Sequence, residues 1–405
     1  MKNSKLLLIA AVVSCLLFPL QSQKFQGLAQ TPPMGWNSWN KFACNVSEKL
    51  IRETADAMVS SGMKDAGYEY VVIDDCWQVS RDSLGFIECD PVRFPSGIKA
   101  LADYVHSKGL KFGIYSCAGD KTCAGRPAGR GHEYQDALMY AKWGVDYFKY
   151  DWCNTDKLNA EGAYITMRDA LHEAGRPIVF SLCEWGNNKP WLWAKEVGQL
   201  WRTTGDIANC FDGITDQGTL KENGVMQILD LQTPLRQYSG PGHWNDPDML
   251  EVGNGMTENE DRAHFTMWCM IAAPLLSGND LVNMSEQTKK ILTNKEIIAI
   301  DQDTLGIQGF KTSVKDSVET WLKPLYNGEW AVCLLNRSKT PKNVTLDWKT
   351  FSITDTLSNR VLDTKGKEIY LLRDVWTKKS FGDTRKTLKT MISGHDVLCL
   401  KLFKK

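Results

Sequence analysis

The sequence lacks an excess of charge of either sign, and it lacks the short motifs that hold metals or phosphates. Its 405 residues include 48 basic and 48 acidic side chains, so no cationic surface for nucleic acid or for an anionic membrane is expected. No CxxC pair occurs and the six histidines are scattered singly, which argues against the usual zinc spacings. The G-x-S-x-G motif of serine hydrolases is absent as well. We therefore expect no metal, no cofactor and no nucleic-acid partner.

Long apolar runs are also absent, except for one at the N-terminus. Two lysines precede the run LLLIAAVVSCLLFPL, and a short polar stretch ending in GLAQ follows it. Pro19 interrupts the run, which is short for a bilayer span, so the layout favours a secretory signal peptide over residues 1–29 with cleavage after Ala29. A lipoprotein signal at Cys15 is disfavoured because apolar residues follow that cysteine. We expect a secreted or periplasmic protein without a membrane span; its oligomeric state is left open.

Cysteine, by contrast, is well represented. An exported chain with twelve cysteines is expected to contain disulfides. If Cys15 leaves with the signal peptide, eleven remain, so at least one thiol stays unpaired or bridges to another chain.

From residue 48 onward, helical runs that end in glycine alternate with apolar runs typical of strands. In the first such unit, Ile51, Ala55, Met58 and Val59 are spaced for one helix face, and the run ends at Gly67. The same pattern recurs at Gly109, Gly144 and Gly175. A helix closed by glycine and followed at once by a strand is typical of βα units.

Eight strands are expected in this part of the chain. They lie in TPPMGWNSW, YEYVVIDDCW, LKFGIYSCAG, VDYFKYDWC, RPIVFSLCEW, QLWRTTGDI, PGHWNDPDML and PLLSGNDL. Eight alternating units predict a (β/α)8 TIM barrel over residues 30–305. A doubly wound open sheet is disfavoured because no glycine-rich phosphate loop follows the first strand.

The pattern changes after Gly306. Five short apolar or alternating runs, separated by polar turns, replace the helical pattern: SVETWLKPL, EWAVCLLNRS, KNVTLDW, KEIYLLRDVW and HDVLCLKLF. They predict a C-terminal antiparallel β-sandwich over residues 306–405.

Polar side chains gather where the barrel strands end, which is where catalytic groups of such barrels lie. The set consists of Asp74, Asp75, Tyr115, Lys149, Asp151, Glu184, Arg202, Asp206, Asp246 and Asp248. For Asp246 a structural role, as a cap, a turn residue or an ion-pair partner, is preferred. Carboxylates accept hydrogen bonds from vicinal hydroxyls, tryptophan offers a face to a pyranose, and two further carboxylates can cleave a glycosidic bond. The composition of this rim therefore favours a carbohydrate-active enzyme.

Within the run VDYFKYDWCN, Lys149 and Asp151 are two residues apart, so strand geometry points both to one face. A nearby ammonium favours the ionised form of a carboxyl. We interpret Lys149 as the charge that keeps Asp151 ionised, and as a donor to a sugar hydroxyl. A plain internal ion pair is the competing interpretation, and it would be costly to bury.

Several long blocks, in order along the chain, resemble those of one family. TPPMGWNSWN, IDDCW, GIYSCAGDKTC, WGVDYFKYDWCN, SLCEWG, WRTTGDI and GPGHWNDPDML are similar to the signature blocks of the glycoside hydrolase family 27 α-galactosidases. The resemblance runs from about residue 31 to 305 and continues more loosely beyond. It implies a retaining α-galactosidase that acts by double displacement on oligosaccharides, polysaccharides or glycoconjugates; together with the expected signal peptide, this predicts an exported enzyme.

The resemblance also assigns roles to residues. It makes Asp151 the nucleophile and Asp206 the acid/base. Contacts with galactose would come from Trp39, Asp74, Asp75, Tyr115, Cys123, Lys149, Glu184, Arg202 and Asp248. Disulfides would join Cys44 to Cys76 and Cys123 to Cys153.

The remaining cysteines depart from the family pattern or lack a clear counterpart in it. Cys183 has no partner at the position used by some animal relatives, and the role of Cys117 is left open. Cys183, Cys269, Cys333 and Cys399 are expected to be buried thiols. Cys89 and Cys210 are left as paired or free.

Three alternatives to an α-galactosidase are weighed. In α-N-acetylgalactosaminidases of the family the residue matching Glu184 is small, so a glutamate here favours galactose. A β-L-arabinopyranosidase is disfavoured because both Asp74 and Asp75 are retained. A non-catalytic galactose-binding protein would be expected to lack Asp151 or Asp206. The natural substrate stays open.

Overall fold

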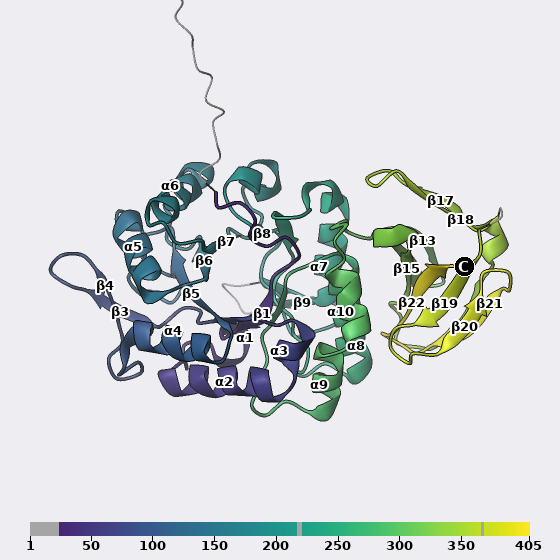
Figure 1. Cartoon of the computed structure of the whole chain (residues 1–405), viewed down its shortest axis with the longest axis horizontal. Helices are drawn as coiled ribbons and strands as arrows, with labels where there is room; N and C mark the ends of the chain where they lie inside the picture. Colours follow the sequence, from purple (N-terminus) through teal and green to yellow (C-terminus); the bar gives the residue numbers. More distant parts are fainter. Residues whose placement is uncertain (1–23, 217–220, 366–367) are drawn as a thin grey trace, which may run out of the picture.

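The computed structural model describes residues 24–216, 221–365 and 368–405, so most of the expected signal segment lies outside the described residues. Figure 1 shows a helix-rich body, which holds residues from the N-terminal part of the chain to about 300, beside a smaller body made of strands. Among the described residues, no helix combines the length and hydropathy needed to cross a bilayer.

The larger body is built on one sheet of eight parallel strands, in the order β11-β8-β7-β6-β5-β2-β1-β12. The two outer members approach each other, because Leu250, just beyond β11, forms a parallel bridge with Ser277 of β12. This arrangement confirms the predicted (β/α)8 barrel. The strands are β1 (Met34–Asn37), β2 (Tyr70–Val72), β5 (Lys111–Cys117), β6 (Tyr147–Asp151), β7 (Val179–Cys183), β8 (Leu200–Arg202), β11 (Trp244–Asp246) and β12 (Leu275–Ser277).

Helices cover the outside of this sheet (Figure 1). They are α1 (Trp39–Phe42), α2 (Glu48–Ser60), α3 (Met63–Ala66), α4 (Gly97–Ser107), α5 (Glu133–Trp143), α6 (Ala160–Glu173), α7 (Val225–Gln232), α8 (Glu258–Met270), α9 (Glu286–Leu292) and α10 (Lys295–Asp301). Between β7 and β8 the connection contains only the 3-10 turns η1 (Pro190–Leu192) and η2 (Ala194–Glu196); a longer 3-10 segment, η3 (Thr233–Tyr238), follows α7.

Helix α2 shows how the sequence specifies these elements. The Ser47 hydroxyl accepts a hydrogen bond from the Leu50 N–H and so caps the helix. Ile51, Ala55 and Met58 are fully buried as predicted, whereas Val59 was wrongly placed on the buried face and is 38% exposed. Val59 lies in the last turn of the helix, which ends at Ser60.

The second body contains a six-stranded antiparallel sheet in the order β13-β14-β15-β22-β19-β20, and two strand pairs, β16-β21 and β17-β18. Its strands are β13 (Phe310–Lys315), β14 (Val318–Pro324), β15 (Trp330–Asn336), β16 (Lys342–Leu346), β17 (Ser352–Asp355), β18 (Arg360–Asp363), β19 (Tyr370–Asp374), β20 (Ser380–Asp383), β21 (Leu388–Ile392) and β22 (Val397–Lys404); two 3-10 turns, η4 (Tyr326–Gly328) and η5 (Trp348–Thr350), connect them. The predicted antiparallel C-terminal sheet domain is confirmed. Five strands were missed. In β13, β17, β18 and β20 half or more of the residues are polar or glycine, and in β21 a lysine and a threonine interrupt the apolar residues.

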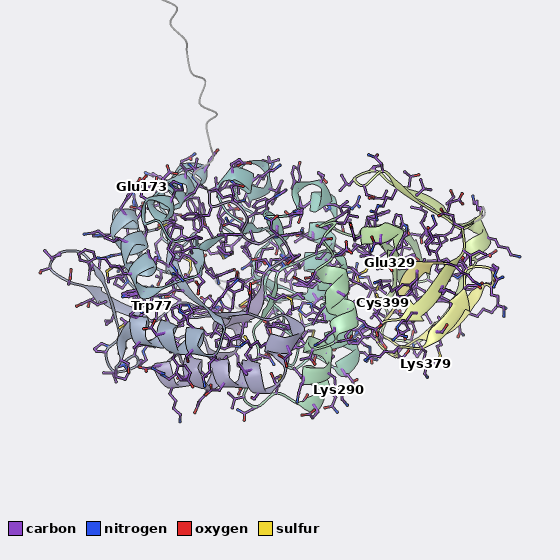
Figure 2. All side chains as sticks on the ribbon, in the orientation of Figure 1. Trp77, Glu173, Lys290, Glu329, Lys379 and Cys399 are labelled. Carbon is purple, nitrogen blue, oxygen red and sulfur yellow. A yellow bond between two sulfur atoms is a disulfide. The ribbon has the colours of Figure 1, made fainter. Side chains whose placement is uncertain are left out.

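The large sheet of this sandwich is buried on both faces. Along β15, Val332 and Leu334 belong to the sandwich core, whereas Ala331, Cys333 and Leu335 belong to the main hydrophobic cluster of the barrel. Helix α8 contacts β14, β15 and β22, and Figure 2 places Cys399 of β22 on the side that faces this helix. The barrel and the sandwich therefore share one apolar interior.

Two hairpins stand outside both sheets. One pairs β3 (Gln78–Arg81) with β4 (Ile87–Cys89), and the other pairs β9 (Ile214–Asp216) with β10 (Lys221–Asn223). Both follow strands whose ends carry candidate site residues, β2 and β8.

Candidate active site

The barrel places the predicted site residues at the carboxyl ends of its strands. Trp39 begins α1 directly after β1, Asp74 and Asp75 follow β2, and Cys123 lies in the loop after β5. Of the others, Tyr115 lies in β5, Lys149 and Asp151 lie in β6, and Arg202 ends β8. Glu184, Asp206 and Asp248 follow β7, β8 and β11, respectively. Hydrogen bonds and ion pairs link most of them into two groups.

The first group is centred on Asp151, the last residue of β6. Its Oδ1 accepts the Trp152 N–H at 2.8 Å, and its Oδ2 accepts the Tyr115 hydroxyl at 3.0 Å. Burial raises the pKa of Asp151 to about 6; the charge of Lys149 lowers this pKa and that of Asp206 raises it. The carboxyl is thus held in one orientation and senses the carboxyl of Asp206.

Lys149 contacts a different carboxylate from the one expected. Its Nζ donates to Asp74 Oδ2 at 2.8 Å, and the Asn37 amide donates to the same oxygen at 2.7 Å. The interpretation of Lys149 as a direct neighbour of Asp151 is therefore incomplete: its ion-pair partner is Asp74, and its effect on Asp151 is through space. The sequence could not show this, because Asp74 comes from β2, two strands away in the sheet.

Asp75 is oriented by backbone groups. Its Oδ1 accepts the Cys76 N–H at 2.6 Å and its Oδ2 accepts the Ala124 N–H at 2.9 Å. Burial raises the pKa of this carboxyl. The loop after β5 therefore closes against the end of β2.

The second group is centred on Arg202 at the end of β8. Its Nη2 lies 3.0 Å from Asp206 Oδ1 and 2.8 Å from Asp248 Oδ2. Asp248 is buried and has φ near +90°, and burial raises its pKa to about 6 although Arg202 lowers it. The side chain of Asp206 is 36% exposed, which leaves this carboxyl accessible from the barrel mouth.

Glu184 follows β7 in a sharply turned loop. Its Oε2 accepts both the backbone N–H (2.5 Å) and the side-chain amide (2.7 Å) of Asn188. Its Oε1 is buried and has no hydrogen-bond partner, and the same holds for Arg202 Nε and Thr204 Oγ1. Burial raises the pKa of Glu184 to about 7. Unpaired polar atoms are costly inside a protein, so this cluster is suited to a polar ligand.

Asn37 and Asn188 orient two site carboxylates and were missed. Asn37 stands at the end of a predicted strand, so its position was a usable signal. Asn188 carries no signal, because only the folded loop brings it back to Glu184. Asp246 fits its preferred structural role: its Oδ1 accepts the Asp248 N–H at 2.9 Å and shapes the turn after β11.

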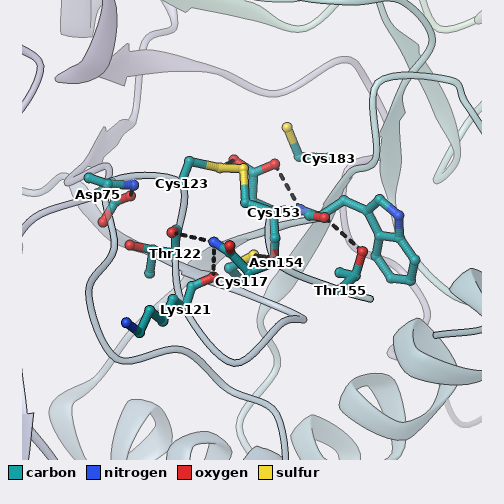
Figure 3. The surroundings of a disulfide bond; sticks show 12 residues. Asp75, Cys117, Lys121, Thr122, Cys123, Cys153, Asn154, Thr155 and Cys183 are labelled. Atoms are coloured by element: carbon teal, nitrogen blue, oxygen red, sulfur yellow. Dashed lines mark hydrogen bonds between the residues drawn. A yellow bond between two sulfur atoms is a disulfide. The ribbon is translucent and has the colours of Figure 1, made fainter. Parts of the chain in front are cut away.

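Both expected disulfides, Cys44–Cys76 and Cys123–Cys153, are present. Figure 3 shows the second one beside Asp75 and Thr122, with Cys117 and Cys183 nearby. Cys123 Sγ lies 3.4 Å from Asp151 Oδ2. Cys123, Asp151 and Cys153 are the three residues grouped closely enough to suggest a metal site in the described chain, but the disulfide leaves no thiolate there.

The remaining described cysteines are thiols. Cys117, Cys183, Cys269, Cys333 and Cys399 are buried, and Cys89 and Cys210 are half-buried. The expectation that Cys183, Cys269, Cys333 and Cys399 are buried thiols is thus confirmed. Cys89 and Cys210, whose pairing the sequence left open, are free thiols. Cys117 Sγ donates to the Cys153 carbonyl at 3.1 Å, and burial raises the pKa of its thiol, so it is held unreactive.

Comparisons with known proteins agree with this fold. A family model described as alpha galactosidase A matches residues 31–303, and one described as the alpha galactosidase C-terminal beta sandwich domain matches residues 315–402. The alpha-galactosidase A of Cellvibrio japonicus is 56% identical over 402 residues, which cover 99% of each chain. The alpha-galactosidase of Cyamopsis tetragonoloba is 50% identical over 325 residues, covering 80% of this chain and 76% of that protein.

A solved structure shares the same fold over nearly the whole chain. Alpha-galactosidase I from Mortierella vinacea superposes with a TM-score of 0.86 at 39% identity and covers 93% of this chain and 98% of that one. An alpha-galactosidase of Saccharomyces cerevisiae, solved with raffinose, gives a TM-score of 0.87 at 30% identity over 95% of this chain and 99% of that one. The chain therefore belongs to glycoside hydrolase family 27 and has α-galactosidase activity.

Proposed function

We propose that the enzyme is exported and that it removes terminal non-reducing α-D-galactosyl residues with retention of configuration, by double displacement. The observation that carries this proposal is the arrangement of Asp151: both of its oxygens are held, it is buried, and it senses the charge of Asp206. Retaining glycosidases need such a carboxyl pair on opposite sides of one glycosidic bond.

In the first step Asp151 attacks the anomeric carbon and the bond to the leaving oxygen breaks. Asp206 delivers a proton to that oxygen, which makes the leaving group neutral. The bonds from Trp152 N–H and the Tyr115 hydroxyl fix the attacking carboxyl, so little orientation must be gained at the moment of reaction.

In the second step water attacks the galactosyl ester and Asp206 removes its proton. Asp206 gave its proton to the leaving group in the first step, so it enters the second step as a carboxylate that can accept a proton from the water. The acid of the first step therefore becomes the base of the second.

The other site residues bind the galactosyl group. Asp74 and Asp75 take the 4- and 6-hydroxyls, since each carboxylate oxygen can accept a further bond beside those already made. Glu184, through its unpaired Oε1, and Arg202 take the 2-hydroxyl. Trp39, Tyr115, Cys123, Lys149 and Asp248 complete the pocket.

The natural substrate class is an α-galactosyl oligosaccharide, polysaccharide or glycoconjugate. The Saccharomyces relative solved with raffinose supports an oligosaccharide. Discrimination against N-acetylgalactosamine follows from Glu184, whose carboxylate occupies the space that an acetamido group on C2 would need.

For the organisation of the chain we propose a signal segment within residues 1–29, a catalytic barrel over 30–305 and a sandwich over 306–405. One observation bears on the exact cleavage point. Lys24 Nζ donates to the carbonyls of Lys195 and Gly242, and the Ala29 carbonyl accepts from Trp244 Nε1 at 2.7 Å. These contacts favour a mature chain that starts before Lys24 over one that starts at Gln30, and sequencing the N-terminus of the exported protein distinguishes the two.

The mechanism is tested with Asp151→Asn and Asp206→Ala, using Asp120→Asn as the matched control. Asp120 is an exposed carboxylate in the loop after β5, paired with Arg130. Asp151→Asn is expected to abolish release of nitrophenol from the α-galactoside, and Asp120→Asn is expected to retain full activity. NMR of the first-formed sugar should show α-galactose; a β-product or an active Asp151→Asn enzyme would overturn the assignment.

A further inference from the structure

One side chain of the sandwich touches the loop that carries Asp206. The ring of His395, in the turn between β21 and β22, stacks on Phe211 with 4.2 Å between ring centroids and 21° between planes. Phe211 is only 4% exposed and lies five positions beyond Asp206. The sandwich thus covers a buried aromatic ring in the same loop as the proposed acid/base.

His395 is itself held from three sides. Its backbone N–H donates to the Ser338 carbonyl at 3.0 Å, and its φ is +51°. Its Nδ1 lies 2.7 Å from Glu260 Oε1; because a carboxylate only accepts, Nδ1 is the protonated nitrogen. Glu260 also accepts the Thr257 N–H in the capping box of α8. The imidazole is therefore fixed to the barrel as well as to the sandwich.

The loop between Asp206 and Phe211 is attached to its surroundings at both ends. The Asp206 carbonyl accepts the Asn223 N–H at 2.8 Å, and the Phe211 carbonyl accepts the Met226 N–H of α7 at 2.9 Å. In addition, the Ile207 N–H donates to Asp248 Oδ2 at 2.9 Å. A short segment that is tied at both ends therefore connects the Phe211 ring with Asp206.

We propose that His395 is a positioning residue for Asp206: the sandwich contributes to catalysis by clamping the acid/base loop through the His395–Phe211 stack. This inference rests on the proposed role of Asp206. Its consequence concerns proton delivery, because a displaced acid slows only those substrates whose leaving group must be protonated.

The test compares two α-galactosides by kcat/KM, which reports the first step. One has an alkyl leaving group, which needs the proton, and the other has a dinitrophenyl leaving group, which does not. A displacement of about 1 Å can cost about a hundredfold, so His395→Ala is expected to lower kcat/KM for the alkyl substrate about ten- to hundredfold, and for the dinitrophenyl substrate less than about threefold. His395→Phe keeps a stacking ring and should restore most of the loss.

Two further variants make the outcome decisive. Arg373→Ala breaks another contact between sandwich and barrel, the bond of Arg373 to Glu296 on α10, and should leave the ratio of the two substrates unchanged. Asp206→Ala should show the same selective loss as His395→Ala, only larger. If Asp206→Ala slows both substrates equally, the acid/base assignment fails. If Asp206→Ala is selective but His395→Ala slows both equally or neither, the positioning role is overturned; thermal melts of all variants confirm that they are folded.

Discussion

Replacing Lys149 by methionine is expected to move the acid limb of the pH profile upward. The pKa of Asp151 is about 6, raised by burial and lowered by Lys149. If Asp151 is the nucleophile as proposed, activity is expected to fall as pH drops through about 6 and this carboxyl becomes protonated. Without the ammonium, the ionised carboxyl loses a favourable neighbour, and its pKa rises further.

The magnitude follows from strand geometry. Side chains two residues apart on one face of a strand lie roughly 7 Å apart. At an effective dielectric constant of about 20, a unit charge at roughly 7 Å contributes about 2.4 kcal/mol, which equals about 1.7 pKa units. The acid limb of kcat/KM in Lys149→Met should therefore lie between about pH 7 and pH 8.

The assay is the pH dependence of kcat/KM on nitrophenyl α-galactoside. Asp74→Asn is the matched control, because the charge of Asp74 raises the pKa of Asp151 and its removal must shift the limb in the opposite direction. Both variants lose a proposed sugar contact, so both are expected to lose overall efficiency. The direction in which the acid limb moves is what distinguishes them. An acid limb that stays in place or moves downward in Lys149→Met would refute the electrostatic role of Lys149.

Three further outcomes are expected. Glu184→Ser removes a hydrogen-bond acceptor for the 2-hydroxyl and so should lower kcat/KM on galactosides about ten- to hundredfold, while raising activity on the matching N-acetylgalactosaminide. Measuring kcat/KM on both substrates checks this, and an unchanged ratio of the two values would contradict it. Replacing both Cys123 and Cys153 by serine opens a loop of 30 residues, so urea unfolding should show a loss of about 3–4 kcal/mol, and an unaltered midpoint would contradict the structural role of the bridge. N-x-[ST] glycosylation sequons begin at Asn45, Asn283, Asn336 and Asn343. Of these four, Asn336 should stay unmodified in a eukaryotic host, because its side-chain amide is buried and donates to three backbone carbonyls; glycopeptide mass spectrometry detects any sugar there.

The barrel was readable from the sequence because its signals are local. Parallel strands covered on both faces appear as continuous apolar runs, and glycine marks the ends of the preceding helices. Gly144, for instance, takes φ near +83° at the end of α5, three residues before β6 begins. The rim residues were readable for the same reason, since each stands at the end of its own predicted strand.

What the sequence could not show depends on contacts between distant segments. The pairing of Lys149 with Asp74 joins β6 to β2, and the hold of Asn188 on Glu184 depends on a loop with φ near +56° at Trp185. Strands such as β17 and β20 are four residues long and carry one large apolar side chain each, so their pairing is decided by neighbours rather than by composition. The stack of His395 on Phe211 spans two separate bodies and has no local signal.

The sheet that is covered on both sides has a consequence for how this enzyme can be dissected or recombined. Cutting the chain after the barrel would expose Ala331, Cys333 and Leu335 on one fragment and the apolar flank of α8 on the other. Neither fragment would be an autonomous module, and a chimera that swaps the catalytic half between relatives must import its partner half with it. Domain exchange, in evolution or by engineering, would therefore have to move the barrel and the sandwich together.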